Sequence, residues 1–283
     1  MQRNVMNKFF AFGERVAPAS STTAQSTPAA RQPALRAGVT LACALAASGA
    51  AVPVHADEAD MKSPAGIRPL SVTVSVTNLT HATWFAPILV AAHPATYTAF
   101  TEGKPATPEL QALAEIGDIA PLAERLPAGS VAVLNPANGP LKPGDTATTK
   151  LPPRKGTLDT RLSILAMLVP TNDAFTALNA IEIPTKPGKY VYTLNGYDAG
   201  TEANNEAQAS APGVGQPGLG LPPFLDDAPD LHRGAPGFAN TRAEGYVHVH
   251  RGIVGSAADG DSVLDHTTYR WMNPVARVTL IVR

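Results

Sequence analysis

Residues 70–77 alternate between apolar and polar side chains over their whole length. Successive side chains of a β-strand point to opposite faces, so this pattern predicts a strand with one face buried and one face in water. The polar positions are serine or threonine, and the apolar positions are Leu70, Val72, Val74 and Val76. The apolar face of this strand must be covered by other parts of the chain, so the sequence requires a sheet that packs against a second layer.

Further short apolar runs predict strands at residues 84–92, 147–151, 162–169, 190–197, 246–253 and 274–282. Only residues 108–115, which Pro108 opens and Gly117 closes, and a short turn at 122–126 have a helical pattern. The 23 glycines and 27 prolines suit many turns, and residues 203–240 are predicted as a long loop. We therefore predict an all-β fold, an antiparallel β-sandwich with one or two short helices in an early connection.

The N-terminus has the pattern of a targeting segment. Arg31 and Arg36 precede an apolar run at residues 37–51, and the small-residue stretch 54–56 follows it. We expect a leader over residues 1–56 with cleavage near Ala56, a linker over 57–69 and a domain over 70–283. The run is too short to cross a bilayer as a helix, so the mature chain is predicted to be exported, periplasmic or secreted, with no transmembrane segment. Cys43, the only cysteine, lies inside this run, which leaves the domain free of disulfides.

Charge and motifs exclude several classes of protein. The formal net charge is −1, and no cluster of lysine and arginine follows the leader, so binding to nucleic acid is not expected. Residues 213–218 match G-x-G-x-x-G, but no predicted strand precedes them and no helix follows, so we interpret the match as a loop. The sequence contains no P-loop, no H-E-x-x-H and no G-x-S-x-G. We predict no catalytic activity.

Two loops concentrate carboxylates next to predicted strands. Asp173 follows the strand that ends at Val169, and Asp198 and Glu202 flank Gly200 in the second loop. Carboxylates that converge repel each other unless a cation neutralises them, and calcium prefers oxygen ligands of this kind. Acidic loops are more often simply solvated, so both interpretations stay open on these residues alone.

A family resemblance favours the metal site. The sequence resembles the N-terminal spondin domain of the F-spondin and mindin family over nearly all of residues 70–283. The matching segments are 71–80, 92–94, 97–103, 106–117, 171–175 and 197–202. The resemblance implies a C2-like β-sandwich that holds calcium at one end of its sheets, with Asp173, Asp198 and Glu202 as ligands. Glu202 departs from the family, which usually has aspartate there.

The same resemblance implies a recognition or adhesion-type module, whose partner would be a protein or glycan of the cell envelope or exterior. The animal proteins carry disulfides and appended repeat domains that this chain lacks. Their adhesion roles are therefore not carried over.

His248 and His250 offer an alternative site. On a strand these two imidazoles point to the same face and could hold zinc or copper, as in a metal-dependent envelope enzyme or a metal-binding protein. The other interpretation is a solvent-facing strand whose opposite face, with Val247 and Val249, fills the core.

Overall fold

The computed structural model describes residues 70–152, 160–238, 242–256 and 259–283, all of which lie in one compact unit, Lys62–Arg283. The predicted leader over residues 1–56, with its cleavage site near Ala56, and the linker over 57–69 lie outside the described residues.

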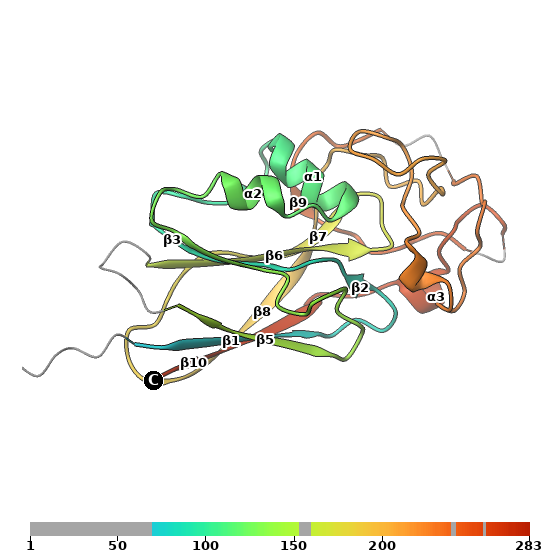
Figure 1. The fold of residues 1–283 in the computed structure, drawn as a ribbon. Helices are drawn as coiled ribbons and strands as arrows, with labels where there is room; N and C mark the ends of the chain where they lie inside the picture. The colour runs from blue at the N-terminus through green and yellow to red at the C-terminus, as the bar shows by residue number, and fades with distance from the viewer. Residues whose placement is uncertain (1–69, 153–159, 239–241, 257–258) are drawn as a thin grey trace, which may run out of the picture. The chain divides into compact units, whose positions relative to one another are not determined.

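The strands form two layers, and every pairing between named strands is antiparallel (Figure 1). One layer contains β1 (Val72–Asn78), β5 (Thr146–Leu151) and β10 (Ala276–Val282), and the other contains β2 (Trp84–Phe85), β3 (Leu89–His93), β4 (Val131–Leu134), β6 (Arg161–Val169) and β7 (Ala174–Glu182). β8 (Gly188–Asp198) belongs to both layers, because its first half pairs with β10 and its second half with β7 and β9 (His248–Val249). The strand order is β4-β3-β6-β7-β8-β10-β1-β5. The predicted antiparallel sandwich is confirmed.

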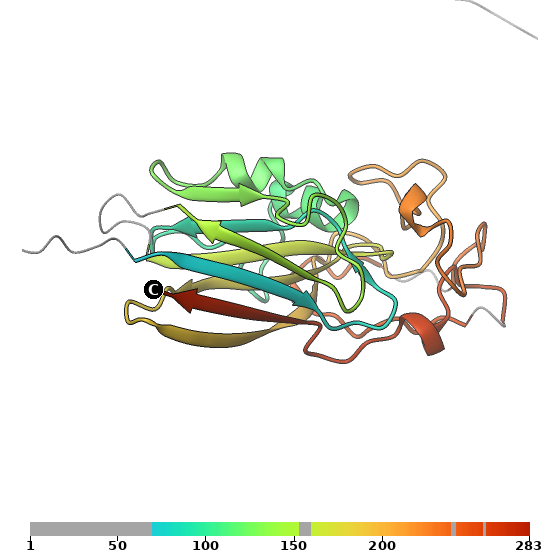
Figure 2. The same ribbon diagram turned by 60° about the horizontal axis from the view of Figure 1, so that its bottom comes forward.

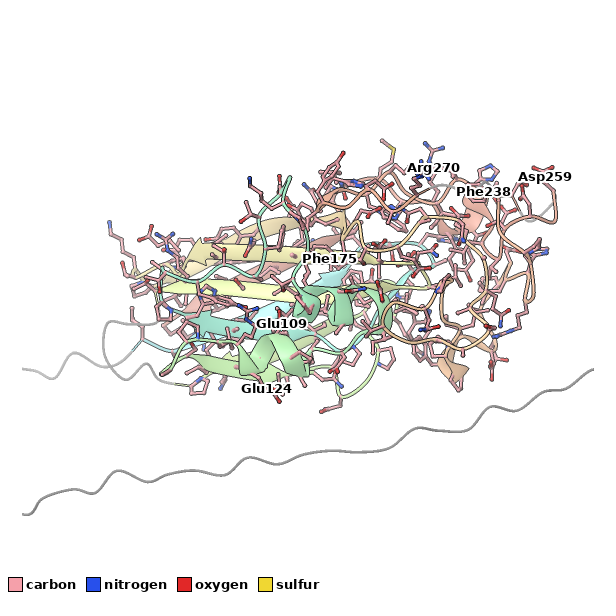
Figure 3. All side chains as sticks on the ribbon, turned by 90° about the horizontal axis from the view of Figure 1, so that it is seen from above. Glu109, Glu124, Phe175, Phe238, Asp259 and Arg270 are labelled. Carbon is pink, nitrogen blue, oxygen red and sulfur yellow. The ribbon has the colours of Figure 1, made fainter. Side chains whose placement is uncertain are left out.

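Two short helices, α1 (Pro108–Ile116) and α2 (Ala120–Glu124), lie in the connection between β3 and β4. The Thr107 side chain accepts a hydrogen bond from the Leu110 N–H at the start of α1, and Gly117 ends the helix with φ of 72°. Apolar residues of α1 pack on the outer face of β6 and β7, and Figure 3 shows Glu109 and Glu124 on the two helices. Because the helices cover its second face, β6 is buried along almost its whole length, as its continuous apolar sequence predicts.

The alternating segment forms β1 with the expected register of buried and exposed positions. The run at 84–92 is divided into β2 and β3, with Pro87 in the break between them. β4 and β7 were not predicted. The first half of β7 is buried on both faces, so its sequence has no alternation for period-two analysis to detect.

Long connections gather at one end of the sandwich, which we call the loop pole (Figures 1 and 2). It is formed by residues 199–238 and by the described parts of 242–273, and contains the short helices η1 (Pro223–Leu225) and α3 (His266–Tyr269). The insertion after residue 203 is a loop as predicted. Within the described part of the chain, no strand leads into residues 213–218 and no helix begins at their end, so the glycine pattern lacks the strand and helix that a dinucleotide site needs.

Candidate metal centre

Strand register places three polar residues together at the start of the loop pole. Asp198 is the last residue of β8; it pairs with Ala174 of β7 on one side and with His248 of β9 on the other. Asp173 directly precedes Ala174, so the connection between β6 and β7 delivers its carboxylate to the same edge. Directly opposed residues on antiparallel strands have neighbouring side chains, and this pairing sets Asp198 beside His248.

The turn after β8 has a backbone that requires glycine. Gly200 has φ of 68°, and a Cβ added to it would lie 2.4 Å from the Tyr246 carbonyl oxygen and 2.6 Å from the Tyr246 nitrogen. The Gly245 N–H donates a hydrogen bond to the Gly200 carbonyl at 2.9 Å. This close approach holds the segment containing Glu244 against the loop that follows Asp198.

Asp173 is fully buried, and only one of its two carboxylate oxygens has hydrogen-bond donors. Oδ2 accepts from the Thr201 N–H at 2.7 Å, from the Thr201 hydroxyl at 3.1 Å and from the Glu202 N–H at 3.0 Å. Oδ1 is buried without a hydrogen-bond partner among the described residues. A carboxylate oxygen left in this way is costly unless a proton or a cation accompanies it.

Two acceptor atoms beside Asp198 are also buried and lack hydrogen-bond partners within the described residues, namely His248 Nε2 and Glu244 Oε2. The opposite ring nitrogen, Nδ1 of His248, lies 3.0 Å from the Val249 carbonyl oxygen. Because a carbonyl can only accept, Nδ1 carries hydrogen in this contact and a neutral ring keeps a lone pair on Nε2. Nε2 lies 3.7 Å from Asp198 Oδ1 and 3.9 Å from Glu244 Oε2.

The electrostatics of the centre follow from burial. Removal from water raises the pKa of Asp173 to about 8, and the charge of Asp198 adds to this increase. Burial also raises the pKa of Asp198, against the hydrogen bonds it accepts from Asn204 and the Gly200 N–H. The electrostatic interaction with His248 also lowers the pKa of Asp198, whereas the charge of Glu244 raises it. Without a cation, the folded protein therefore disfavours full ionisation of this group of carboxyls.

His250 lies close to the centre but uses both of its ring nitrogens elsewhere. Nε2 lies 3.2 Å from the Asn204 side-chain oxygen, and Nδ1 accepts the Gly252 N–H at 2.8 Å. Burial lowers the pKa of His250 to about 3, so the ring is neutral. Both histidines of the predicted pair face Asp198, since His250 Nε2 is 3.9 Å from Asp198 Oδ2. In this structure, however, His250 orients Asn204, while Nε2 of His248 has no hydrogen-bond partner among the described residues.

The Glu202 side chain points to other partners. Its Oε1 accepts hydrogen bonds from the Asn172 amide at 2.7 Å and from the Gly218 N–H. Only its backbone N–H joins the centre, through Asp173. The structure thus brings Asp173 and Asp198 together as predicted and gives the Glu202 carboxylate a role in holding the insertion.

Sequence reasoning missed Glu244. One ligand atom each from Asp198, Glu244 and His248 lies within 4.8 Å of the others, the arrangement that a bound metal ion requires. The chain separates Glu244 from Asp198 by 45 residues and by the whole insertion, and no motif links them. Asp198, Glu244 and His248 fit a divalent cation, which would neutralise the carboxylates and bind the ring nitrogen. The Asp173 carboxylate interacts electrostatically with Asp198 at this site.

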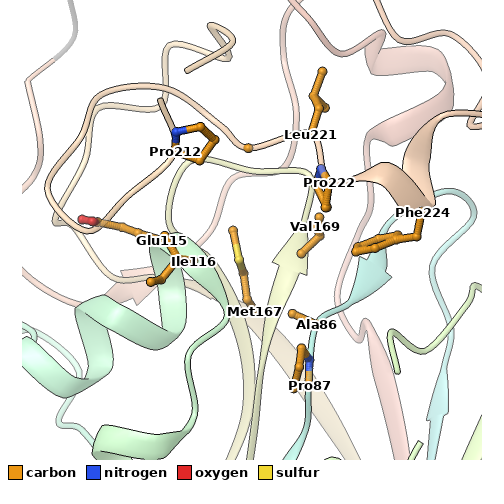
Figure 4. Close-up of a pocket in the computed structure, with 11 residues that line it drawn as sticks. Ala86, Pro87, Glu115, Ile116, Met167, Val169, Pro212, Leu221, Pro222 and Phe224 are labelled. Atoms are coloured by element: carbon orange, nitrogen blue, oxygen red, sulfur yellow. The ribbon is translucent and has the colours of Figure 1, made fainter. Parts of the chain in front are cut away.

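An apolar cavity of about 250 Å³ lies elsewhere, between the end of α1 and the insertion (Figure 4). Its lining includes Ile116, Met167, Leu221 and Phe224, with Glu115 at its rim. The Gly215 N–H donates a hydrogen bond to Glu115, which fastens the insertion to the helix. The cavity shares no lining residue with the metal centre.

Comparison with known families identifies the domain. Residues 77–212 match the family described as Spondin_N. The predicted resemblance to the spondin N-terminal domain family is confirmed over these residues. The match includes Asp173, Asp198 and Glu202, whereas Glu244 and His248 of this spondin domain lie beyond the matched residues. No curated protein matches the chain.

The spondin domain family is of the extracellular recognition and adhesion type. Among the helices of the described residues, none combines the length and apolarity needed to cross a bilayer.

Proposed function

We propose that this chain is an exported recognition module without catalytic activity, periplasmic or secreted, whose loop pole is held together by a bound calcium ion. The observation that carries the proposal is the group of one ligand atom each from Asp198, Glu244 and His248, all within 4.8 Å of one another. The buried Asp173 carboxylate, with Oδ1 lacking a hydrogen-bond partner among the described residues, interacts electrostatically with Asp198 of this group. A divalent cation would remove the repulsion between these carboxyls and fix three segments relative to one another: the connection before β7, the turn after β8 and the segment before β9.

Calcium is favoured by the number of carboxylates. Asp173, Asp198 and Glu244 supply oxygen ligands, and calcium commonly completes its shell of six to eight ligands with carbonyl oxygens and water. The partner would then contact the loops that the ion orders, as a protein or glycan of the envelope or exterior.

Thermal unfolding tests the calcium proposal. We expect calcium to raise the Tm of the full chain and a chelator to lower it, because the ion binds only the folded state. Asp198→Ala should abolish this difference, whereas Asp227→Ala, which removes an exposed carboxylate of the insertion, should preserve it. We call the proposed calcium ion and the loop segments that it holds together the calcium clamp. A wild-type Tm that does not respond to calcium or chelator would refute it.

A transition metal is the second candidate, and His248 Nε2 is the observation that favours it. Zinc accepts imidazole nitrogen together with carboxylate oxygen, whereas calcium prefers oxygen alone. Such an ion could activate water in a metal-dependent enzyme if one coordination position stays open.

His248→Gln separates the two candidates, because it replaces the ring nitrogen by an amide oxygen. Calcium affinity should be kept or improved in this variant, whereas zinc affinity should fall at least tenfold. Metal analysis of protein purified without a His-tag provides the independent check: stoichiometric zinc or copper would support the second candidate.

A further inference from the structure

The outer face of the layer β5-β1-β10-β8 has a regular and unusual composition. Register aligns its outward side chains in three rows, each of which crosses all four strands. The first row is Lys150, Thr73, Ile281 and Lys189; the second is Thr148, Ser75, Thr279 and Val191; the third is Thr146, Thr77, Arg277 and Thr193. We call these twelve residues the hydroxyl face.

Seven of the twelve residues are threonine or serine, three are lysine or arginine, and none is acidic. The chain as a whole has 22 basic and 23 acidic residues, so this face departs from the overall balance. No ion pair joins Lys150, Lys189 or Arg277 to a carboxylate of the described residues. The face therefore carries three uncompensated positive charges on an otherwise slightly acidic molecule.

Other elements of the described chain leave the face uncovered. The helices α1 and α2 lie on the opposite layer, and Figure 2 shows β1, β10 and β8 with no helix across them. Neighbouring strands are about 4.8 Å apart, so Lys150 and Lys189 at the two ends of one row are separated by about 14 Å. Arg277 lies two rows away, so the charges are spread across the face.

The hydroxyl groups are partly pre-arranged. Ser75 and Thr148 share a hydrogen bond of 2.9 Å, and Thr77 and Thr146 share one of 2.8 Å across β1 and β5. Cross-strand pairs of this kind fix the rotamers of the hydroxyls, which leaves an ordered array of small donors and acceptors. A ligand that lies on this array can form many hydrogen bonds at little cost in side-chain ordering.

We propose that the hydroxyl face binds a linear anionic polysaccharide. A sugar chain offers hydroxyls that pair with the threonines and serines, and its acidic groups complement the three separated cations. A membrane surface fits less well, because the face has two aliphatic side chains, Ile281 and Val191, no aromatic one, and dispersed cations. This inference adds a second binding surface to the proposed recognition role and does not use the metal centre.

The test measures binding of the full chain to immobilised dextran sulfate, with unmodified dextran as the neutral polymer of the same backbone. We expect binding to dextran sulfate alone, and weaker binding as salt increases. The triple variant Lys150→Gln, Lys189→Gln, Arg277→Gln should lower the affinity about tenfold, since each exposed ion contact contributes modestly. The matched control Lys104→Gln, Lys142→Gln, Arg270→Gln removes equal charge elsewhere and should change the affinity by less than about twofold.

A second variant tests the hydroxyls. Thr73→Val with Thr279→Val keeps β-branched side chains and removes two hydroxyl groups, so binding should weaken severalfold while its salt dependence stays the same. Equal loss in the two triple variants would show attraction by net charge and would overturn the proposal. Preferential binding to vesicles of equal parts phosphatidylglycerol and phosphatidylcholine, a dimer that the face variants dissociate, or no binding to dextran sulfate would also overturn it.

Repeating the measurement with calcium and with chelator distinguishes this proposal from the metal clamp. Loss of the calcium effect on Tm with intact polysaccharide binding would refute only the clamp. Loss of polysaccharide binding with an intact calcium effect on Tm would refute only the proposed binding at the hydroxyl face.

Discussion

Asp198 of β8 and His248 of β9 lie directly opposite each other, with Oδ1 of the aspartate 3.7 Å from Nε2 of the histidine. The separation is too long for a hydrogen bond, and both atoms face Glu244. Nε2 is buried beside two carboxylates and has no hydrogen-bond partner among the described residues, so the position favours a positively charged ligand. The proposed divalent cation, shared with Asp173, would supply that charge.

The first prediction concerns pH. The pKa of Asp173 is raised by burial and by Asp198, so its folded value, about 8, lies above its unfolded value of about 3.9. A raised carboxyl pKa contributes stability that is complete below the unfolded pKa and is lost as pH rises through the folded pKa. In chelator, Tm should therefore fall by several degrees between pH 5 and pH 8, and calcium should reduce the fall.

The matched variant for this prediction is Asp173→Asn, which keeps an acceptor for the Thr201 and Glu202 N–H groups. Glu202, Glu206 and His250 titrate in both proteins, so the difference between the two Tm profiles isolates Asp173. Parallel profiles for wild type and variant in chelator would contradict the assignment of the raised pKa to Asp173.

The second prediction separates Glu244 from Glu202 as a ligand. Glu244→Gln should weaken calcium binding at least tenfold, because ligand charge strongly sets calcium affinity. Glu202→Gln keeps the oxygen that accepts from Asn172 and the Gly218 N–H, so it should change the affinity by less than about twofold. Isothermal titration calorimetry of both variants gives the comparison, and the opposite order would restore Glu202 as the ligand that the family resemblance implies.

Asp173 and Asp198 could be predicted from the sequence because each lies at or within four residues of the end of a strand with a clear apolar pattern, β6 and β8, and the family resemblance covers both. Glu244 could not, because its position depends on β9, whose two residues are too short to give a pattern, and on the close contact of Gly200 with Tyr246. The contacts of the Glu202 carboxylate could not be predicted either, because one of them is a hydrogen bond from the Gly218 N–H, 16 residues away in the insertion. The sequence predicted that His248 and His250 would both be free to bind a metal. In the structure, Asn204 and Gly252 contact the two ring nitrogens of His250, and no local pattern indicates these contacts.

Prediction of the strands and helices has the same limit, because only elements with a local sequence signal could be predicted. β1 and α1 carry complete local signals: period-two alternation in one, and a threonine cap, a first-turn proline and a closing glycine in the other. β7 has neither, because the opposite layer buries one face of its first half and α1 buries the other. Its strand character results from tertiary packing, which a local pattern does not record.

The third prediction concerns the turn that positions the centre. Gly200→Ala should destabilise the protein by roughly 3 kcal/mol, because it combines a left-handed backbone with a clash against the Tyr246 backbone. Gly103→Ala is the control: φ there is 75°, and an added Cβ meets nothing within 4 Å. That change should cost only about 1 kcal/mol. Urea unfolding of both variants measures the difference, and equal costs would show that the contact with Tyr246 is not restrictive.

The fourth prediction concerns Glu206, a buried carboxylate that joins the insertion to the loop before α3. Its Oε1 accepts from the Val254 N–H, and its Oε2 accepts from the Gly255 N–H and the Ser262 hydroxyl. Glu206→Gln places an amide N–H against donors on one side, which should cost roughly 2 kcal/mol. Urea unfolding measures this cost, and limited proteolysis should show earlier cleavage in the loop pole. Wild-type behaviour in both assays would contradict this role.

The most direct test of the calcium clamp is the number of calcium ions that the full chain binds, measured by equilibrium dialysis with wild type and Asp173→Asn in parallel. We predict one ion per chain for the wild type and loss of that ion in the variant, which would fold and remain at least as stable in chelator. No bound calcium in the wild type, or equal binding by the variant, would contradict the clamp.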